Sequence, residues 1–284
     1  MRKVLTLAVV LVAALALPLG AQDFETTEIA DGVYQFRWVG HNGMFVVAGD
    51  AVVAFDPINS EAAAALAREI RRVAPTARLA AIVYSHSDAD HATGAPALMA
   101  GLDAGEVPII AQERAVAPIR ERADPEQPVP TVTFAERMSF DVGGRRIELH
   151  YLGPSHTDNI AVAFVPDAGV AFAVDFVAND RVGYQGLPGW RFPEFFDALA
   201  GMLGIPFETV IFGHGPAGDR ASVRRQIAYY DALTAAVRSG FAAGLSEDEV
   251  AEGIELSEFA HFGQFEEWMP LNARALYRWI AGGR

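Results

Sequence analysis

The segment at residues 84–94, YSHSDADHATG, concentrates side chains that bind metal ions. It holds His86, Asp88, Asp90 and His91, although the whole chain has only 7 histidines. The apolar run LAAIVY leads into it and is typical of a buried strand. Side chains alternate along a strand, so residues 86, 88 and 90 share one side, and a turn into a helix brings His91 to the same space. Any one of these residues alone is readily explained as a helix cap or a core residue, but four in this order indicate a metal site.

Three further polar residues follow strand-like segments elsewhere in the chain. His156 lies in the turn GPSHTDN, Asp175 ends the apolar run AFAVD, and His214 lies between glycines in VIFGHGP. A carboxylate at the end of an apolar strand is costly unless a partner compensates its charge, and functional residues gather in connecting loops. We therefore expect these three residues to join the cluster at 86–91. Of the other histidines, only His41, in GHNG, is a candidate, for the rim of the site.

The segments that must position these residues have the patterns of strands and helices in two successive halves. Strand-like runs lie at 32–38, 43–49, 50–57, 79–85, 107–112, 147–153, 160–166, 169–176 and 209–216. Helical patterns lie at 60–74 and, in the C-terminal part, at 221–241, 246–254 and 265–280. Ser60 is the expected N-cap of the first helix, and Pro75 follows its end. This mixture predicts a layered α/β domain in which helices cover paired sheets.

The composition limits both the chemistry and the partners. The 284 residues include 36 acidic and 22 basic side chains, which gives a formal charge of −14. Such a chain has no basic stripe for phosphate backbones, so nucleic acid is not an expected partner. Its only lysine is Lys3, which leaves no lysine for a Schiff base or a general base in a processed chain. Because there is no cysteine, disulfides are excluded and a metal site must use nitrogen and oxygen ligands.

Residues 1–21 have the pattern of a secretory signal peptide. A basic start, MRK, leads into an apolar run that ends at Leu19, and small residues precede Gln22. The apolar run is shorter than the ~20 residues that a membrane-spanning helix needs. We therefore expect a signal peptide at 1–21 and a single domain at 22–284 with a helical C-terminal part. The protein should be periplasmic or secreted, without stable membrane insertion after cleavage.

The ordered motifs resemble those of the metallo-β-lactamase superfamily, whose pattern is His-x-His-x-Asp-His, then a lone His, an Asp or Cys, and a last His. The resemblance runs from IADGVYQF through FGHGP and rests on HSDADH, HTDN, VD and GHGP in that order. It implies an αββα sandwich with two divalent metal ions at one edge of the sheets, zinc being preferred and iron or manganese being alternatives. It also implies the ligands, which are His86, Asp88 and His156 for the first metal, Asp90, His91 and His214 for the second, and Asp175 as a bridge.

Asp88 departs from the family pattern, which usually has histidine at this position. Aspartate binds zinc at similar distances, so a ligand is retained. Its negative charge should weaken the Lewis acidity of the first metal and raise the pKa of bound water. A carboxylate also widens the choice of metal toward iron and manganese.

The resemblance implies a hydrolase in which a metal-bridging hydroxide attacks an ester, thioester, lactone or amide of a small-molecule substrate. Asp90 would orient the hydroxide and is the expected catalytic residue. We expect weak β-lactam turnover, because Asp88 is present and no lysine is available to hold a substrate carboxylate. Two alternatives stay open. One is a diiron redox protein of the same fold, although the residues after His214 are too few for the flavin domain that such a protein needs. The other is a metal- or ligand-binding protein with impaired catalysis.

The loop at 177–192, rich in Gly, Pro and aromatic residues, follows the expected bridging aspartate and is suited to wall a pocket. Arg181, Tyr184, Trp190 and Arg191 are its candidate substrate contacts. The alternative, a surface loop packed by its own aromatic side chains, stays open at this point.

Overall fold

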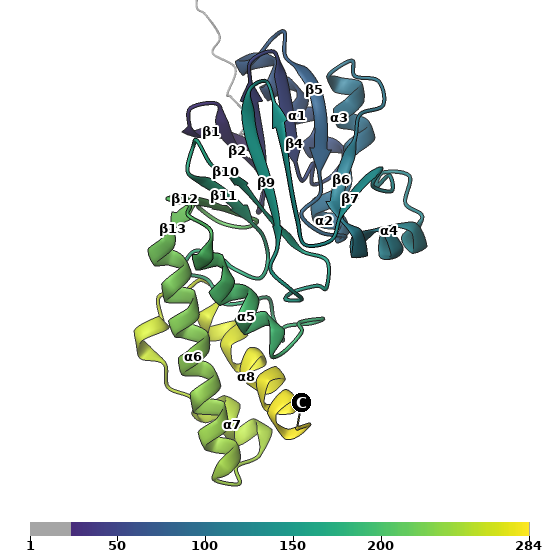
Figure 1. Cartoon of the computed structure of the whole chain (residues 1–284). Coiled ribbons are helices and arrows are strands. Elements are labelled where there is room, and N and C mark those ends of the chain that lie inside the picture. The colour runs from purple at the N-terminus through teal and green to yellow at the C-terminus, as the bar shows by residue number, and fades with distance from the viewer. Residues whose placement is uncertain (1–23, 284) are drawn as a thin grey trace, which may run out of the picture.

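Two β-sheets pack face to face. Helices of the first half lie against the outer face of the first sheet, and helices of the second half lie beside the second sheet (Figure 1). The computed structural model of the chain describes residues 24–283, and the expected signal peptide at 1–21 lies outside them. Within the described residues, no helix is long and apolar enough to cross a membrane. The layered arrangement confirms the predicted αββα sandwich.

The first sheet has 7 strands in sequence order. They are β1 (Phe24–Ala30), β2 (Val33–Trp38), β3 (His41–Ala48), β4 (Ala51–Phe55), β5 (Arg78–Val83), β6 (Ile109–Gln112) and β7 (Val132–Phe134). The strands from β1 to β4 form an antiparallel meander, whereas β4 to β7 run parallel. Parallel neighbours need crossover connections, and helix α1 (Ser60–Val73) and helix α3 (Ala95–Gly101) supply crossovers on the outer face of this sheet.

The N-cap of α1 is Asn59, so the expectation of Ser60 is wrong. Asn59 has extended backbone and its side chain accepts a hydrogen bond of 2.9 Å from the backbone N–H of Ala62. Ser60 is already the first helical residue, and its hydroxyl instead hydrogen-bonds Glu126. A cap residue needs non-helical backbone, and only Asn59 provides it.

The second sheet has 6 strands in the order β13-β12-β11-β10-β9-β8. They are β8 (Arg137–Val142), β9 (Arg145–Tyr151), β10 (Ala161–Val165), β11 (Val170–Ala173), β12 (Thr209–Phe212) and β13 (Gly218–Asp219). Only β11 and β12 pair in parallel, and α5 (Glu194–Gly201) lies in the connection between them.

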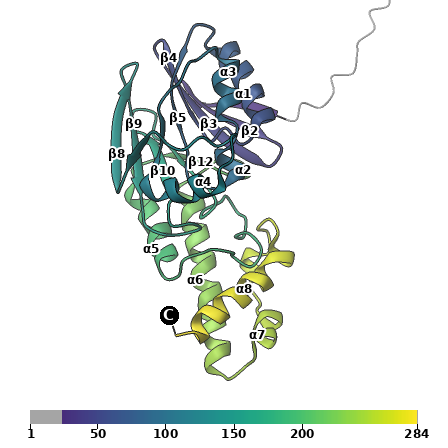
Figure 2. The same cartoon turned by 90° about the vertical axis from the view of Figure 1, so that its right-hand side faces the viewer.

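The C-terminal part is helical and forms a lobe beside the sandwich (Figures 1 and 2). It contains α6 (Arg220–Ala242), α7 (Glu247–Gly253) and α8 (Phe265–Ala281), which confirms the helices expected in this part of the chain. Two short helices, α2 (Ala89–Ala92) and α4 (Val116–Arg122), lie in connections of the first sheet. Buried residues of the lobe belong to the same core as the inner faces of the two sheets.

The strand directions bring distant residues to one edge of the sandwich. Because β3 is antiparallel to β4 and β4 is parallel to β5, the start of β3 lies beside the ends of β4 and β5. In the second sheet β9, β11 and β12 point the same way, since β10 is antiparallel to both β9 and β11. Their ends therefore share an edge, and the turns that follow them carry the polar residues singled out in the sequence.

The interface between the sheets is tightly packed. Phe55 of β4 and Phe172 of β11 are each 1% exposed and meet edge to face, with ring centroids 6.2 Å apart. Phe172→Ala should lower the free energy of unfolding by about 3–5 kcal/mol, because it leaves a cavity between the sheets. Denaturant unfolding measures this change. Phe241→Ala is the matched control, since Phe241 is 39% exposed and should lose no more than about 1 kcal/mol. Equal losses for the two variants would contradict the assigned core.

Candidate metal centre and its cleft

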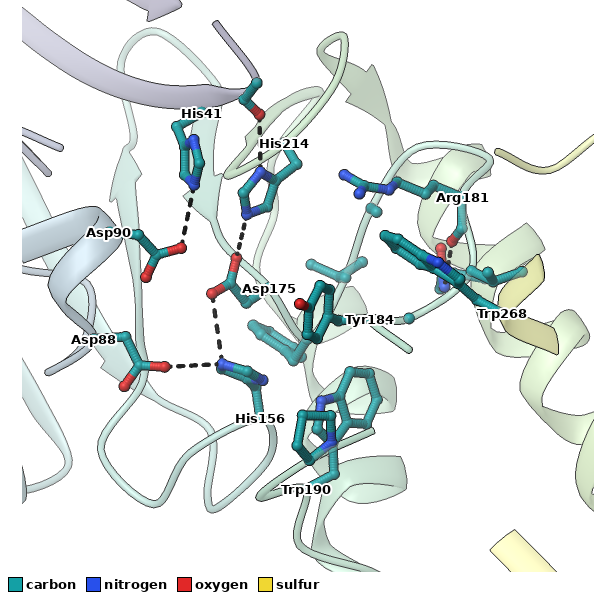
Figure 3. A pocket seen from close by; sticks show the side chains of 18 of the residues that line it. His41, Asp88, Asp90, His156, Asp175, Arg181, Tyr184, Trp190, His214 and Trp268 are labelled. Carbon is teal, nitrogen blue, oxygen red and sulfur yellow. Dashed lines mark hydrogen bonds and ion pairs between the residues drawn. The ribbon is translucent and has the colours of Figure 1, made fainter. Parts of the chain in front are cut away.

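All seven residues predicted as metal ligands lie together at the shared edge of the two sheets. Figure 3 shows five of them, which are Asp88, Asp90, His156, Asp175 and His214. Their ligand atoms fall into two groups on either side of Asp175. The first group is His86, Asp88 and His156, and the second is His41, Asp90, His91 and His214. The grouping agrees with the ligand sets implied by the resemblance, with His41 as an addition.

The carboxylate of Asp175 lies between the two groups. Its Oδ2 is 3.3 Å from Nε2 of His86 and 3.6 Å from Nε2 of His156. Its Oδ1 is 3.3 Å from Nε2 of His91 and 3.1 Å from Nε2 of His214. Asp175 has a φ of 63°, a left-handed conformation that is costly for a residue with a side chain and that clusters at functional sites. One oxygen therefore faces each group, as a bridging ligand requires.

Asp88 faces the first group. Its Oδ2 is 3.1 Å from Nε2 of His156 and 3.6 Å from Nε2 of His86. Asp88 does occupy the N-cap position of α2, but its side chain makes no capping hydrogen bond. The carboxylate is thus directed at the histidines of the first group and not at the helix.

Asp90 and His41 lie at the open side of the second group. Nε2 of His41 is 3.2 Å from Oδ2 of Asp90, whose side chain is about half exposed. His41 begins β3, opposite the end of β4. Its sequence context, a hairpin turn before a strand, indicates only a rim position, because nothing in it shows which strand ends lie nearby.

A buried carboxylate behind the cluster orients one histidine of each group. Oδ1 of Asp56 accepts the Ser85 N–H at 2.7 Å, and Oδ2 accepts the Ser85 hydroxyl at 2.6 Å. The same Oδ2 is 3.2 Å from Nδ1 of His91, and the Ser85 oxygen is 2.9 Å from Nδ1 of His86. Because the Ser85 proton goes to Asp56, Nδ1 of His86 is the donor to Ser85. Both imidazoles then present Nε2 to the centre, as metal-binding histidines do. The sequence interpretation missed Asp56, although it ends a strand-like run as Asp175 does.

The donor atoms fit a metal centre. Nε2 of His86, Nε2 of His91 and Oδ1 of Asp175 are buried and have no hydrogen-bond partner within the described residues. Buried polar atoms are normally hydrogen-bonded, and imidazole nitrogens and carboxylate oxygens that converge without partners are the ligands of zinc and similar ions. Nδ1 of His214 lies 2.8 Å from the carbonyl oxygen of Gly40, which only accepts, so Nδ1 is the donor and Nε2 of His214 faces the cluster.

Gly213 allows the end of β12 to lie close to the end of β11 and to His91. A Cβ atom at this position would lie 2.6 Å from Cβ of Val174 and 3.1 Å from Cε1 of His91. The end of β12 can therefore approach the end of β11 and the second group only because residue 213 has no side chain.

In the metal-free protein, the histidines and carboxylates of the cluster shift one another's pKa values. Burial lowers the pKa of His86, but the carboxylates of Asp175 and Asp88 outweigh it and raise this pKa to about 9. Burial likewise opposes protonation of His91, yet Asp175 and Asp56 raise its pKa well above the ordinary value. Burial alone would raise the pKa of Asp175, but the surrounding histidines hold it well below the ordinary value. In the metal-free protein, protons therefore neutralise the carboxylates, and a metal ion must displace them.

A cleft of about 800 Å³ opens onto the cluster. The loop that follows Asp175 lines it with Arg181, Tyr184 and Trp190, whereas Arg191 lines a separate cleft of about 850 Å³. The guanidinium of Arg181 lies 5.0 Å from the centre of the Trp268 ring of α8 and points toward the metal centre (Figure 3). Among the described residues it has no carboxylate within salt-bridge distance, and no hydrogen-bond acceptor.

Comparisons with known proteins identify relatives of this fold. The model of the metallo-beta-lactamase superfamily matches residues 36–223. A solved structure of a metallo-beta-lactamase from Pontibacter korlensis is 21% identical with a TM-score of 0.62, over 73% of this chain and 99% of that chain. The crystal structure of VMB-1 is 19% identical with a TM-score of 0.61, over 74% of this chain and 97% of that chain. At these identities the structures establish the fold alone. No curated protein sequence matches the chain.

The raised pKa values of His86 and His91 predict how metal binding depends on pH. Below pH about 9 His86 is protonated in the metal-free protein, and ligation requires its neutral form. Zinc affinity should therefore rise as the pH increases from 6 toward 9, and zinc binding at pH 7 should release about two protons from these histidines. Calorimetric titration in buffers with different ionisation enthalpies counts the released protons. An affinity that stays flat over this range would contradict the predicted protonation.

Proposed function

Because the chain belongs to the metallo-β-lactamase superfamily, we propose that it is a metal-dependent hydrolase with a binuclear metal centre. The observation that carries the proposal is the position of Asp175, with one carboxylate oxygen toward each group of ligand atoms. When bound, a pair of divalent metal ions polarises the scissile group of the substrate and lowers the pKa of water.

The residues of the two groups would hold these ions. His86, Asp88 and His156 would hold the first ion, and Asp90, His91 and His214 the second, with Asp175 between them. Imidazole and carboxylate ligands together suit zinc, which we propose as the metal, while the carboxylates also accept iron or manganese. Asp56 would hold the imidazole of His91 directly, and that of His86 through Ser85, in the ligating tautomer.

Asp90 is the proposed catalytic residue. Burial raises the pKa of its carboxyl, but the hydrogen bond with His41 outweighs this and lowers the pKa below the ordinary value. An ionised carboxylate that lines the cleft can accept a hydrogen bond from a water molecule and so orient it toward the substrate.

The cleft favours a small substrate that has both an apolar part and an anionic group. Within residues 24–283, Arg181 is the only arginine in its lining, and the aromatic rings of Tyr184, Trp190 and Trp268 surround the space beside it. A guanidinium without an acidic partner among the described residues is suited to hold a carboxylate or another anion. The absence of lysine argued against such an anchor in the sequence, and Arg181 supplies the missing positive charge. We therefore propose an anionic ester, thioester, lactone or amide as the substrate.

The helical lobe decides much of the shape of this cleft. Gln226, Tyr230 and Trp268 line it, and all three lie beyond the residues 36–223 that match the family model. The substrate preference therefore does not follow from family membership. We also propose that residues 1–21 direct the protein to the periplasm or the medium, where such small substrates are accessible.

A panel of anionic esters, thioesters, lactones, amides and β-lactams tests the proposed hydrolase. The zinc-loaded protein should hydrolyse members of the panel, and a chelator should abolish turnover until zinc is restored. We expect weak β-lactam turnover and an alkaline pH–rate profile in the native protein, because Asp88 adds negative charge at the first ion. Asp88→His should shift this profile toward lower pH.

The outcomes separate the proposed hydrolase from its alternatives. Turnover of a reductant and oxygen by the iron-loaded protein, without hydrolysis, would identify a diiron redox protein. Metal binding without either activity would identify an impaired metal-binding protein. His261→Ala is the control variant, because His261 is exposed and lies outside both ligand groups.

The role of Arg181 is tested by removing its charge. Arg181→Met should raise KM for an anionic substrate by about tenfold or more, and should leave a neutral analogue of the same substrate nearly unchanged. Arg191→Met is the matched control, since Arg191 lines the other cleft. Equal effects of Arg181→Met on the charged and the neutral substrate would show that Arg181 contributes packing and no anion binding.

A further inference from the structure

We propose that His41 is a ligand of the second metal ion. Compared with the family pattern, the first metal site would then have one imidazole fewer and the second one imidazole more. This inference rests on the binuclear centre proposed above. At the first site Asp88 stands where the family pattern has histidine, and at the second site His41 adds a histidine that the pattern lacks. Five histidines thus still surround the two ions, but they are divided as two and three.

The position of its ring supports ligation by His41. One ligand atom from each of His41, Asp90, His91 and His214 lies within 4.8 Å of the others. The ring centroid of His41 is 4.6 Å from that of His214 and 5.6 Å from that of His91. Ligands at about 2.1 Å from one ion lie up to about 4.2 Å apart, so small side-chain rotations bring all four onto a single ion.

The backbone on both sides of His41 is fastened to the loop that carries His214. The carbonyl of Gly40 accepts a hydrogen bond from Nδ1 of His214. The backbone N–H of Asn42 donates to the carbonyl of Gly213 at 2.8 Å. The side-chain amide of Asn42, which is fully buried, donates to the carbonyls of Phe212 and Gly215 at 2.8 and 2.7 Å. These bonds join the first sheet to the second and hold His41 at a fixed place beside His214.

The uneven division of imidazoles predicts which site fills first. The second site would have three imidazoles, Asp90 and one oxygen of Asp175, whereas the first would have two imidazoles, Asp88 and the other oxygen. Imidazole suits zinc, and carboxylates suit manganese and magnesium. The first equivalent of zinc or cadmium should therefore occupy the second site, and the first site should bind these ions more weakly.

The competing role for His41 is a hydrogen bond that only orients Asp90. The two roles differ in the number of nitrogen atoms bound to the metal. We would add one equivalent of ¹¹³Cd to metal-free protein that contains ¹⁵N-labelled histidine and count the one-bond couplings to cadmium. Ligation predicts a cadmium signal coupled to three nitrogens in the native protein and to two in His41→Gln. The exposed control, His261→Gln, should keep three.

The native spectrum alone decides the proposal, even if a variant fails to fold. If cadmium is raised to two equivalents so that both sites are occupied and no signal couples to three nitrogens, ligation by His41 is overturned and the metal centre stays in place. Failure of the native protein to bind zinc or cadmium at all would instead overturn the binuclear centre. A zinc titration supplies a second test. His41→Gln and His41→Ala should both lower the affinity for the first equivalent of zinc by at least about tenfold. If His41 only hydrogen-bonds Asp90, His41→Gln should keep the native affinity, because its amide can still donate to Asp90.

Discussion

The buried carboxylate of Asp175 is the constraint on which the rest of the site depends. A negative charge at the end of an apolar strand is unfavourable unless opposite charges or metal ions compensate it. Four imidazole nitrogens, from the three connections that follow β5, β9 and β12, lie within 3.1 to 3.6 Å of its two oxygens. The edge of the sandwich is therefore built around this carboxylate, and the chain accepts a left-handed backbone at Asp175 to place it there.

Two sets of hydrogen bonds hold the two sheets in the register that the centre needs. Asp56 and Ser85, at the ends of β4 and β5, fix the rings of His86 and His91 within the first sheet. Asn42, at the start of β3, joins the first sheet to the loop after β12 in the second. Since each ligand group draws residues from both sheets, a shift of one sheet against the other would separate the ligands. The apolar core between the sheets and this polar edge thus stabilise the same arrangement.

The residues of the proposed metal centre and much of the cleft wall come from different parts of the chain. The metal centre lies within the residues that match the family model, whereas α6 and α8 of the helical lobe wall the cleft from outside that region. The lobe packs on the sandwich through a continuous apolar core in which Tyr230 is fully buried. Under the proposed function, the metal ligands would supply the chemistry and the lobe would select the substrate.

The sequence patterns predicted nine of the thirteen described strands and the C-terminal helices but missed β1, β7, β8 and β13. The resemblance of the ordered motifs to the family pattern implied the αββα class and the seven residues of the cluster. The sequence did not determine the partners of Asp88, since a residue before a short helix serves equally as a cap or a ligand until its side-chain direction is known. It also missed Asp56 and left His41 at the rim. Their roles depend on which strand ends are neighbours, and hydrophobic patterns specify the faces of a strand but not its neighbours. Only the tertiary structure places the start of β3 beside the ends of β4 and β12, where His41 meets the second ligand group.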